Sequence, residues 1–404
     1  MKWTRLFKGF FESEKTGGVL LLLCTAISLL IANSAWGEGY LHFWHSRIDL
    51  SFGGINLNYS VEQWINDGLM TIFFLLVGLE IERELYAGEL SSFSNAILPV
   101  VAAVGGMLVP AAIHYLFNAG TPTQHGFGIP MATDIAFALG MLALAGNRVP
   151  YSVKIFLTAL AIIDDLGAIL VIAIFYNSGV QWLYLGLSAG ILVGLLVLSR
   201  LGVRHLAFYL VPGVVLWYCM MQSGIHPTIA GVLLAFVIPF SGENESTPSY
   251  RLQHALHKPV AYLIVPVFAL ANTGIFLEEG WLSQMTTQNS LGIIAGLVLG
   301  KPIGILLFCW LLVKLTSIRL PTYVQWKNLL GAAVLAGIGF TMSIFISNLA
   351  FEDARTVSYA KVAVLIGSLI ATTLGLLILF NTKKVTKAIE EGYEPGSADL
   401  TQRT

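Results

Sequence analysis

The stretch IFLTALAIIDDLGAILVIAIFY, residues 155–176, is long and apolar enough to cross a membrane, yet two adjacent carboxylates, Asp164 and Asp165, lie inside it. A helix of about 20 apolar residues spans the hydrocarbon core of a bilayer. An acidic side chain at the centre of such a helix costs roughly 2.5–3.5 kcal/mol. We therefore expect the chain to use these two carboxylates rather than merely to tolerate them.

The composition of the whole chain is that of a membrane protein. Of its 404 residues 56% are hydrophobic and only 11% are charged, and the mean hydropathy is +0.76. Soluble domains carry about 25% charged residues, so this chain has too few to cover a globule in water. The formal net charge of −1 gives no indication of a nucleic-acid partner. The three cysteines, Cys24, Cys219 and Cys309, lie far apart in apolar runs and predict neither a disulfide framework nor a metal cluster.

The apolar runs predict an all-α polytopic membrane protein with twelve transmembrane helices. The runs centre on residues 17–33, 62–82, 95–117, 127–145, 153–176, 180–199, 205–222, 226–240, 259–277, 290–313, 328–350 and 357–380. A cleaved signal peptide is an alternative for the first run, although its polar lead-in is long. We expect residues 1–382 to form one membrane domain and residues 383–404 a cytoplasmic tail.

The basic residues support this count and orient the chain. With the N-terminus in the cytoplasm, the inner segments hold all of the 22 Lys and Arg residues except Arg47, Lys301, Arg355 and Lys361. Of these exceptions, Lys301 falls within a span and the others fall in outer segments. Because basic residues favour the cytoplasmic side, we predict that both termini are cytoplasmic.

One outer loop has the period of a β-strand. In RIDLSFGGINLNY (47–59) apolar and polar residues alternate on both sides of Gly53 and Gly54. Alternation around a two-glycine turn predicts a short extracytoplasmic β-hairpin over residues 46–59, with an irregular loop as the alternative. A lone hairpin is marginal in water, so we expect it to pack on the membrane domain or on a second copy of the chain.

The ionisable residues predicted to lie deep in the membrane are Asp134, Asp164, Asp165 and Lys301. A structural ion pair of Lys301 with one aspartate would still leave acidic groups in excess. A carboxylate without a partner in low dielectric must bind a proton or a cation, so we predict a site that carries a small cation. Two protons returned for each cation would make the exchange electrogenic.

Two of the predicted spans contain helix breakers. Pro130 precedes Thr133 and Asp134 in GIPMATDIAFALG (128–140), and Gly337 and Gly339 interrupt AGIGFTMSIF (336–345). The two segments are weakly alike. Broken helices at corresponding places of two repeats indicate a transport site, although the likeness of glycine-rich spans can arise by chance.

Five motifs resemble the NhaA-type Na⁺/H⁺ antiporters of bacterial inner membranes, and the similarity covers nearly the whole chain. They are FFLLVGLEIEREL (73–85), ATDIAFALG (132–140), KIFLTALAIIDDLGAI (154–169), GKPIGI (300–305) and GIGFTMSIFI (337–346).

The resemblance implies a Na⁺/Li⁺ and proton site at Asp164 and Asp165, with Thr133 beside the cation path. It implies that Asp134 and Lys301 balance the dipoles of two broken helices, the fourth and eleventh, that cross at mid-membrane, and that Lys301 can pair with Asp164. It further implies inverted-topology repeats of spans three to five and ten to twelve, and a homodimer formed through the hairpin. No cofactor is expected.

The resemblance also implies a response to pH through Glu80, Arg83, Glu84 and His226. Without it, the first three would be a solvated helix end and His226 an ordinary interfacial histidine. Gln253 stands where the family pattern has a glutamate, and because an amide cannot titrate the response here would rest on fewer groups or lie at a different pH.

The predicted function is therefore electrogenic, pH-regulated export of Na⁺ and Li⁺ in exchange for protons, for sodium and pH homeostasis. A Na⁺- or H⁺-coupled symporter of a small organic solute is the first alternative, but it would need more polar groups near the midplane. A non-transporting scaffold is the second, and it would have no use for excess carboxylates.

Overall fold

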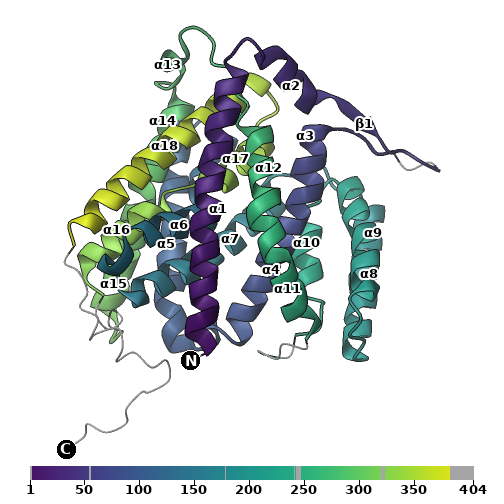
Figure 1. Cartoon of the computed structure of the whole chain (residues 1–404), viewed down its shortest axis with the longest axis horizontal. Helices are drawn as coiled ribbons and strands as arrows, with labels where there is room; N and C mark the ends of the chain where they lie inside the picture. Colours follow the sequence, from purple (N-terminus) through teal and green to yellow (C-terminus); the bar gives the residue numbers. More distant parts are fainter. Residues whose placement is uncertain are drawn as a thin grey trace, which may run out of the picture.

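The computed structural model describes residues 2–53, 56–177, 179–240, 242, 247–318, 320 and 324–382, and it describes side chains from residue 16 on, except that of residue 147. The predicted cytoplasmic tail, residues 383–404, lies outside the described residues. The described chain is helical apart from one pair of short strands (Figure 1).

The first half of the chain holds two long, uninterrupted apolar helices, α5 and α7. In chain order its elements are α1 (Lys2–Ala32), α2 (Gly37–His45), β1 (Arg47–Asp49), β2 (Asn58–Ser60), α3 (Val61–Gln63), η1 (Trp64–Leu69), α4 (Met70–Tyr86), η2 (Glu89–Ser91), α5 (Phe93–Phe117), η3 (Pro122–Met131), α6 (Ile135–Leu144), η4 (Gly146–Arg148) and α7 (Tyr151–Phe175).

The second half begins with two helices, α8 and α9, at one edge of the molecule (Figure 1). Its elements are α8 (Trp182–Arg200), α9 (Ala207–Ser223), α10 (Ile229–Ala235), α11 (Pro248–Pro259), η5 (Val260–Ile264), α12 (Val265–Asn272), α13 (Trp281–Gln284), α14 (Gln288–Ala295), η6 (Gly296–Gly300), α15 (Lys301–Leu315), α16 (Trp326–Ala336), α17 (Phe340–Ala350) and α18 (Ala354–Phe380).

The molecule is a multi-pass membrane protein. Seven helices of the described chain are long and apolar enough to cross a bilayer: 61–86, 93–117, 151–175, 182–200, 248–272, 288–315 and 354–380. Three bent pairs raise the number to ten, with bends of 114° between α1 and α2, 45° between η3 and α6, and 42° between α16 and α17. The shorter α9 and the seven-residue α10 fall below this length. The count of twelve spans stays a prediction.

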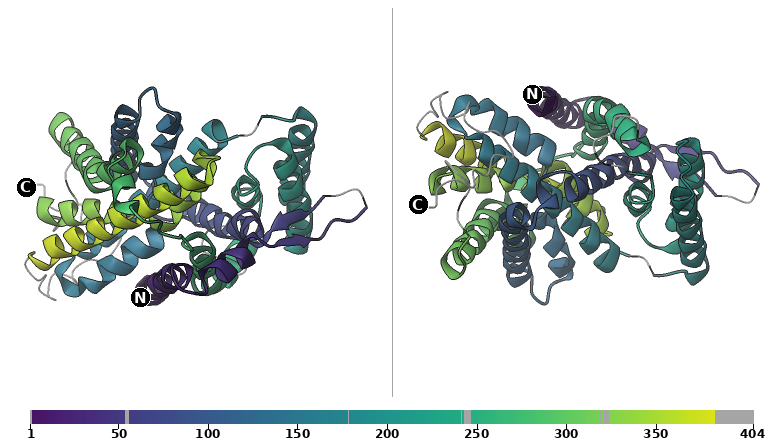
Figure 2. Two further views of the ribbon diagram at one scale, coloured as in Figure 1. Left: turned by 90° about the horizontal axis from the view of Figure 1, so that it is seen from above. Right: turned by 90° about the horizontal axis from the view of Figure 1, so that it is seen from below.

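The helices pack as two bundles. In the site bundle α5 packs on α15, α7 and η3, and α18 packs on α14, α16 and α17. In the flanking bundle α4 packs on α10, α1 on α12, and α8 on α9. The seam between the two bundles is formed by α1 against α6, α4 against α7, and α12 against α17. Figure 2 shows the helices from above and from below.

The site bundle depends on a close approach of α5 and α15. A Cβ atom added to Gly105 would lie 2.7 Å from Cβ of Phe308, and one added to Gly106 would lie 2.9 Å from Cγ1 of Ile305. Small residues at helix interfaces let the backbones of membrane helices approach closely. This contact fixes α15, which begins with Lys301, against α5.

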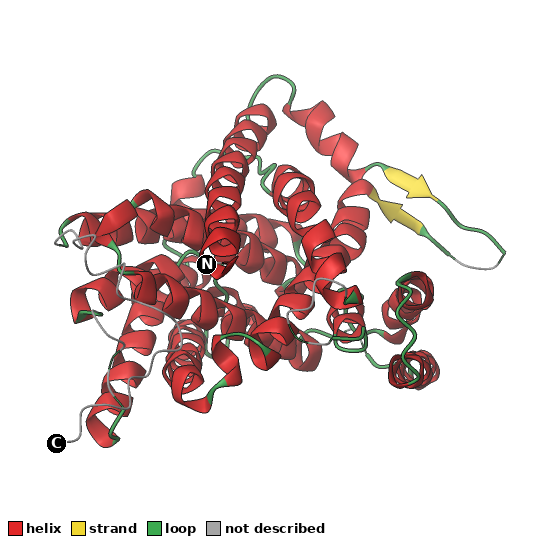
Figure 3. Cartoon of the chain, turned by 60° about the horizontal axis from the view of Figure 1, so that its bottom comes forward, coloured by secondary structure: helices red, strands yellow, loops and turns green. Residues whose placement is uncertain are grey.

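Two strands form an antiparallel ladder that extends sideways from the helices (Figure 3). Arg47 pairs with Ser60 and Asp49 with Asn58. The predicted turn includes Gly54, which lies outside the described residues, so the closed hairpin stays a prediction. The end of the molecule that carries these strands is called the hairpin end below.

The burial of Lys361 was not predicted. We assigned this residue to an outer segment, and it lies in the second turn of α18 with 7% of its surface exposed, while its side of the membrane stays a prediction. Charge counting along the chain cannot detect this burial, because the partner of Lys361 belongs to a distant helix.

Candidate functional site

The two interrupted helices contact each other at their breaks. Residues 132–134 separate η3 from α6, and residues 337–339 separate α16 from α17. The amide of Asp134 donates to the carbonyl of Ile338 at 2.7 Å, and the hydroxyl of Thr133 donates to the carbonyl of Ala336 at 2.9 Å. The breaks therefore satisfy each other's backbone groups, which could not otherwise remain unpaired inside a membrane.

Each break has a local cause in the sequence. Pro130 has no amide hydrogen and lies within the 3₁₀ segment η3 just before the first break. At the second break Gly339 lies against η6, since a Cβ atom added there would be 2.9 Å from Cδ2 of Leu297. Gly337 is the C-cap residue of α16, and its backbone angles are still helical.

Asp164 lies at the centre of this crossing. Its Oδ2 atom is 2.5 Å from Nζ of Lys301 and accepts a hydrogen bond of 2.7 Å from the hydroxyl of Thr133. Both Asp164 and Lys301 are fully buried. Lys301 also donates to the carbonyl of Met131, the last residue of η3.

Asp165 has no such basic partner. Its side chain is 2% exposed, and among the described residues no Lys, Arg or His lies within ion-pair distance of it. Atom Oδ1 of Asp165 and atom Oδ1 of Asp164 are both buried without a hydrogen-bond partner. A buried, unpartnered carboxylate oxygen is costly unless a proton or a cation joins it.

Asp134 lies where two helices begin. It is the N-cap of α6 and accepts from the amide of Phe137 at 3.0 Å. Its other oxygen accepts from the amide and the hydroxyl of Thr341, in the first turn of α17, at 3.1 and 2.5 Å. A carboxylate at two helix N-termini is stabilised by both dipoles, and no basic side chain of the described chain forms an ion pair with Asp134.

The ends opposite to these N-termini are met by different groups. Lys301 contacts the end of η3, whereas the end of α16 is met by Thr133, which donates to the carbonyl of Ala336. The resemblance gave Lys301 the role of balancing the C-terminal ends, and that role stays a prediction. The hydroxyl of Thr133 contacts one of these ends as well.

The site offers oxygen atoms suited to a hard cation. Carboxylates, a hydroxyl and backbone carbonyls, as found here, are the ligands that such cations prefer. No group of three or more His, Cys, Asp and Glu side chains in the described chain could hold a metal ion. Cys219 and Cys309 are buried thiols, Cys24 is partly buried, and all three are free.

The four residues predicted to respond to pH form two separate groups, one near each end of α4. Near its C-terminus Glu80 is buried and Arg83 pairs with Glu84 at 2.9 Å. His226 lies at the hairpin end, with Nε2 3.7 Å from Asp67. Since helix rise is about 1.5 Å per residue, roughly 20 Å separates Asp67 from Glu80. The structure does not bring His226 together with the other three.

Further residues join the C-terminal group of α4. Ser249 of α11 donates to Glu82 at 3.2 Å, and the same helix buries Gln253. The amide of Glu89 donates to Glu84 at 3.1 Å. Burial and the neighbouring Glu84 carboxylate raise the pKa of Glu89, against a hydrogen bond from Asn95. Sequence reasoning gave no role to Glu82, which lies within the quoted motif 73–85, or to Glu89, which follows it.

Thr341 is the other site residue that sequence reasoning left without a role. The sequence did contain a signal for it. Thr341 follows the glycines of the second break, and in the first break Thr133 follows Pro130 in a similar way. What the sequence could not give was the contact between the two breaks.

Comparisons with known proteins agree with this geometry. The family model described as Na⁺/H⁺ antiporter 1 matches residues 8–379. The Na⁺/H⁺ antiporter NhaA of Cytophaga hutchinsonii is 53% identical over 402 residues, covering 100% of both chains. That of Dechloromonas aromatica is 55% identical over 382 residues, covering 94% of this chain and 96% of the relative.

A solved structure is similar in fold. The sodium proton antiporter MjNhaP1 from Methanocaldococcus jannaschii, at pH 8, superposes with a TM-score of 0.53 over 95% of this chain and 99% of that chain. Its sequence identity is 13%, so the likeness concerns the fold alone.

Proposed function

The chain belongs to the Na⁺/H⁺ antiporter 1 family, and from this premise we propose that it exports Na⁺ and Li⁺ through Asp164 and Asp165 in exchange for protons. It is a secondary transporter rather than an enzyme, and its relatives carry the name of Na⁺/H⁺ antiporters. Nothing in these relatives supports the symporter alternative.

The observation that carries the proposal is the imbalance of charge at the crossing. Lys301 can neutralise Asp164, while Asp165 lies beside it, buried and without a basic partner in the described chain. Export would proceed as a cation binds the carboxylates and the hydroxyl of Thr133, and protons would displace it on the other side of the membrane. No cofactor enters this cycle.

Exchange would be electrogenic if two protons return for each cation. Asp165 and the Asp164–Lys301 pair can each take up one proton, which supports this ratio. Imposing a K⁺ diffusion potential with valinomycin on vesicles should then change the rate of exchange, and an unchanged rate would indicate electroneutral exchange.

We further propose twelve spans with inverted repeats of spans three to five and ten to twelve. The broken pairs η3–α6 and α16–α17, which would be the middle members of the repeats, support this arrangement because they meet at their breaks. Both termini would lie in the cytoplasm of a bacterium, with the protein in the inner membrane and the hairpin end outside. Regulation by pH would use Glu80, Arg83, Glu84 and His226.

The test is exchange in everted membrane vesicles that respiration has made acidic inside. NaCl or LiCl should collapse the pH difference in the wild type, and Asp164→Asn and Asp165→Asn should each abolish the collapse at equal protein abundance. Asp49→Asn, which neutralises an exposed carboxylate on β1, is the matched control and should leave exchange unchanged. Normal exchange in either site variant would contradict the assignment of that carboxylate.

A further inference from the structure

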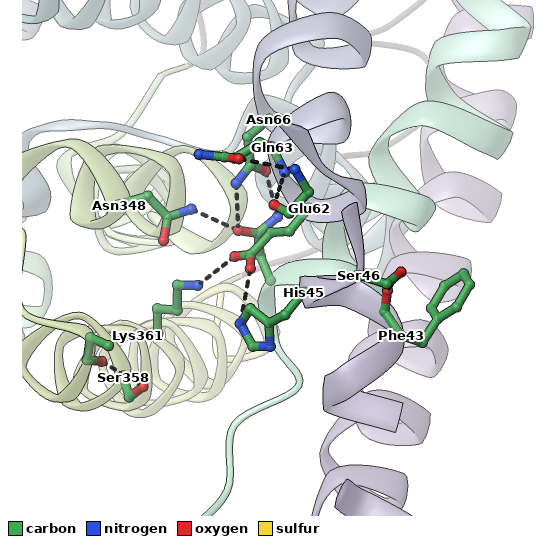
Figure 4. Close-up of polar contacts among 12 residues, drawn as sticks. Phe43, His45, Ser46, Glu62, Gln63, Asn66, Asn348, Ser358 and Lys361 are labelled. Carbon is green, nitrogen blue, oxygen red and sulfur yellow. Dashed lines mark hydrogen bonds and ion pairs between the residues drawn. The ribbon is translucent and has the colours of Figure 1, made fainter. Parts of the chain in front are cut away.

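A partly buried ion pair joins the two bundles at the hairpin end. Nζ of Lys361, in α18 of the site bundle, lies 3.7 Å from Glu62, in α3 at the start of the flanking bundle's α4 segment. The side chains are 9% and 22% exposed. Figure 4 shows Glu62 between Lys361 on one side and His45 on the other, and His45 lies 3.6 Å from the same carboxylate.

A chain of carboxamides crosses the seam beside this pair. The amide of Asn272, in α12, donates to Asn66 at 2.8 Å, and the oxygen of Asn272 accepts from Asn348, in α17, at 2.6 Å. Asn272 is 1% exposed. Figure 4 shows Asn66 and Asn348 on the same side of Glu62. The bond between Asn348 and Asn272 joins the two bundles, and the bond between Asn272 and Asn66 continues the chain within the flanking bundle.

Helix α17 connects these contacts to the crossing. Thr341 at its start binds Asp134, Phe345 one turn later packs against the rings of Phe74, Phe268 and His226, and Asn348 follows in the amide chain. Phe345 is fully buried. From the crossing toward the hairpin end, α17 thus contributes first the aromatic contact of Phe345 and then the carboxamide of Asn348. The ion pair follows, and its Lys361 belongs to α18.

We propose that Glu62, Lys361 and the carboxamides of Asn66, Asn272 and Asn348 form a clasp that closes the hairpin-side ion route. Transport requires the site to open alternately to each side, and the seam is where the two bundles can part. The clasp holds the seam shut at one end only, so it stabilises the state open to the other side. This inference rests on the proposed ion site, and it assigns these five residues a positioning role rather than contact with the transported ion.

The clasp predicts opposite effects on the two sides of the membrane. Breaking it populates the state open at the hairpin end, and apparent affinity for a ligand scales with the fraction of competent protein. Lys361→Met removes the ion pair while leaving His45 beside Glu62. We expect the apparent KM for Na⁺ offered on the hairpin side to fall about threefold or more, and the KM on the opposite side not to fall.

The measurement uses acid-loaded membrane vesicles of both orientations, right-side-out and everted, and uptake of radioactive Na⁺. Exchanging the charges, with Glu62→Lys and Lys361→Glu together, should restore both KM values toward the wild type. Asn348→Ala, a milder change in the same clasp, should shift the hairpin-side KM in the same direction. Arg355→Met is the matched control, because it breaks an exposed ion pair with Glu278 at the same end of α18 and should change neither KM.

Equal changes of KM on both sides, or none, in Lys361→Met and Asn348→Ala at wild-type abundance would overturn the clasp. The proposed ion site is tested separately by Asp165→Asn. If that variant exchanges normally the site is wrong, whereas intact exchange with no sidedness in the clasp variants refutes only the clasp.

Discussion

At the scale of single residues, Thr133 links the carboxylate to the backbone of the second broken helix. Its hydroxyl contacts both Asp164 and the carbonyl of Ala336 within hydrogen-bond distance. One proton serves two acceptors, so the hydroxyl oxygen stays available as a ligand for a cation. Replacing Thr133 by a residue of the same shape that lacks the hydroxyl oxygen should weaken cation binding, while both carboxylates remain in place.

We predict that Thr133→Val raises the KM for Na⁺ about three- to tenfold, as expected for the loss of one polar contact of 0.5–1.5 kcal/mol. The maximal rate should fall less than in the aspartate variants. Thr133→Ser keeps the hydroxyl and is the control. The measurement is Na⁺-dependent collapse of the pH difference in everted vesicles, and a valine variant with the KM of the wild type would exclude Thr133 from the cation path.

The sequence identified the acidic pair because carboxylates deep in a membrane are expensive and few. It could not show that Asp134 binds Thr341, since the two residues are 207 positions apart and only tertiary folding brings the breaks together. The pairing of Lys301 with Asp164 followed from family resemblance and is present in the structure. The burial of Lys361 was not predicted, because the sequence around a basic residue near a helix end does not show whether a distant carboxylate pairs with it.

At the scale of elements, the position of Lys301 depends on the contact between α5 and α15. Gly105 and Gly304 face each other across this contact, and Gly304 lies one turn beyond Lys301. A side chain at Gly105 would meet Phe308 and push α15 outward. Overpacking of this kind typically costs about 1–3 kcal/mol.

We therefore predict that Gly105→Val lowers the thermal stability of the purified protein and strongly reduces exchange, because Lys301 is displaced from Asp164. Gly190→Val is the matched control, since nothing lies within 4 Å of a Cβ atom built there on α8. Both changes place a β-branched residue in a helix. Equal losses in the two variants would point to helix propensity instead of the α5–α15 contact.

The segment after α4 predicts a dependence of stability on pH. Burial and the nearby Glu84 raise the pKa of Glu89 above its ordinary value of 4.5. The folded chain then keeps a proton that the unfolded chain has lost, so the stability falls as pH rises through the folded pKa. The unfavourable contribution of Glu89 to the free energy of unfolding is absent at pH values below the ordinary pKa of 4.5. It is fully present at pH values above the raised pKa of the folded chain.

Glu89→Gln removes that contribution. Its melting temperature should match the wild type near the ordinary pKa and exceed it increasingly toward neutral pH, as measured by thermal unfolding in detergent. Glu279→Gln, in an exposed loop, is the control for the loss of one surface carboxylate. A constant difference across the range would mean that Glu89 is not destabilised by its surroundings.

Helix breakers predicted the interrupted elements well, because Pro130 and the glycines act through the local backbone. Other boundaries depend on packing that the sequence does not show. The polar segment RLQHALH belongs to α11, which continues without interruption into η5 and α12, since it packs on α4 and buries Leu252 and Gln253. Helix α10 covers only Ile229–Ala235 of the apolar run 226–240, which contains Pro227 before the helix begins and continues for five residues after it ends.

At the scale of the whole molecule, the ion pair of Glu62 and Lys361 and the bond between Asn272 and Asn348 lie at the seam between the two bundles. If the seam were lined by apolar side chains alone, opening it at one end would cost the same free energy as opening it at the other. Directed polar contacts at one end raise the cost of opening there, so the two open states differ in free energy. The membrane class was predictable from composition alone. The division into bundles was not, because α8 and the segment 288–315 have similar mean hydropathies, 2.0 and 2.1, but belong to different bundles.

The strands at the hairpin end leave apolar side chains without a cover. Ile48, Leu50 and Phe52 are 43%, 54% and 66% exposed, and they alternate along the chain so that they share one face. A two-stranded ladder is marginal in water unless it packs on something. The ladder extends away from the helices (Figure 3), so we expect a second copy of the chain to cover this face.

Replacing these three residues together, Ile48→Ser, Leu50→Ser and Phe52→Ser, should convert a dimer into a monomer in detergent, as measured by light scattering after size-exclusion chromatography. Asp49→Asn, on the opposite face of the strand, is the control and should leave the dimer intact. Exchange per chain in vesicles should persist in the monomer, because Asp164, Asp165 and Lys301 all come from one chain. A dimer that survives the triple change would place the interface elsewhere, and a monomer without exchange would mean that the partner subunit contributes to the ion route.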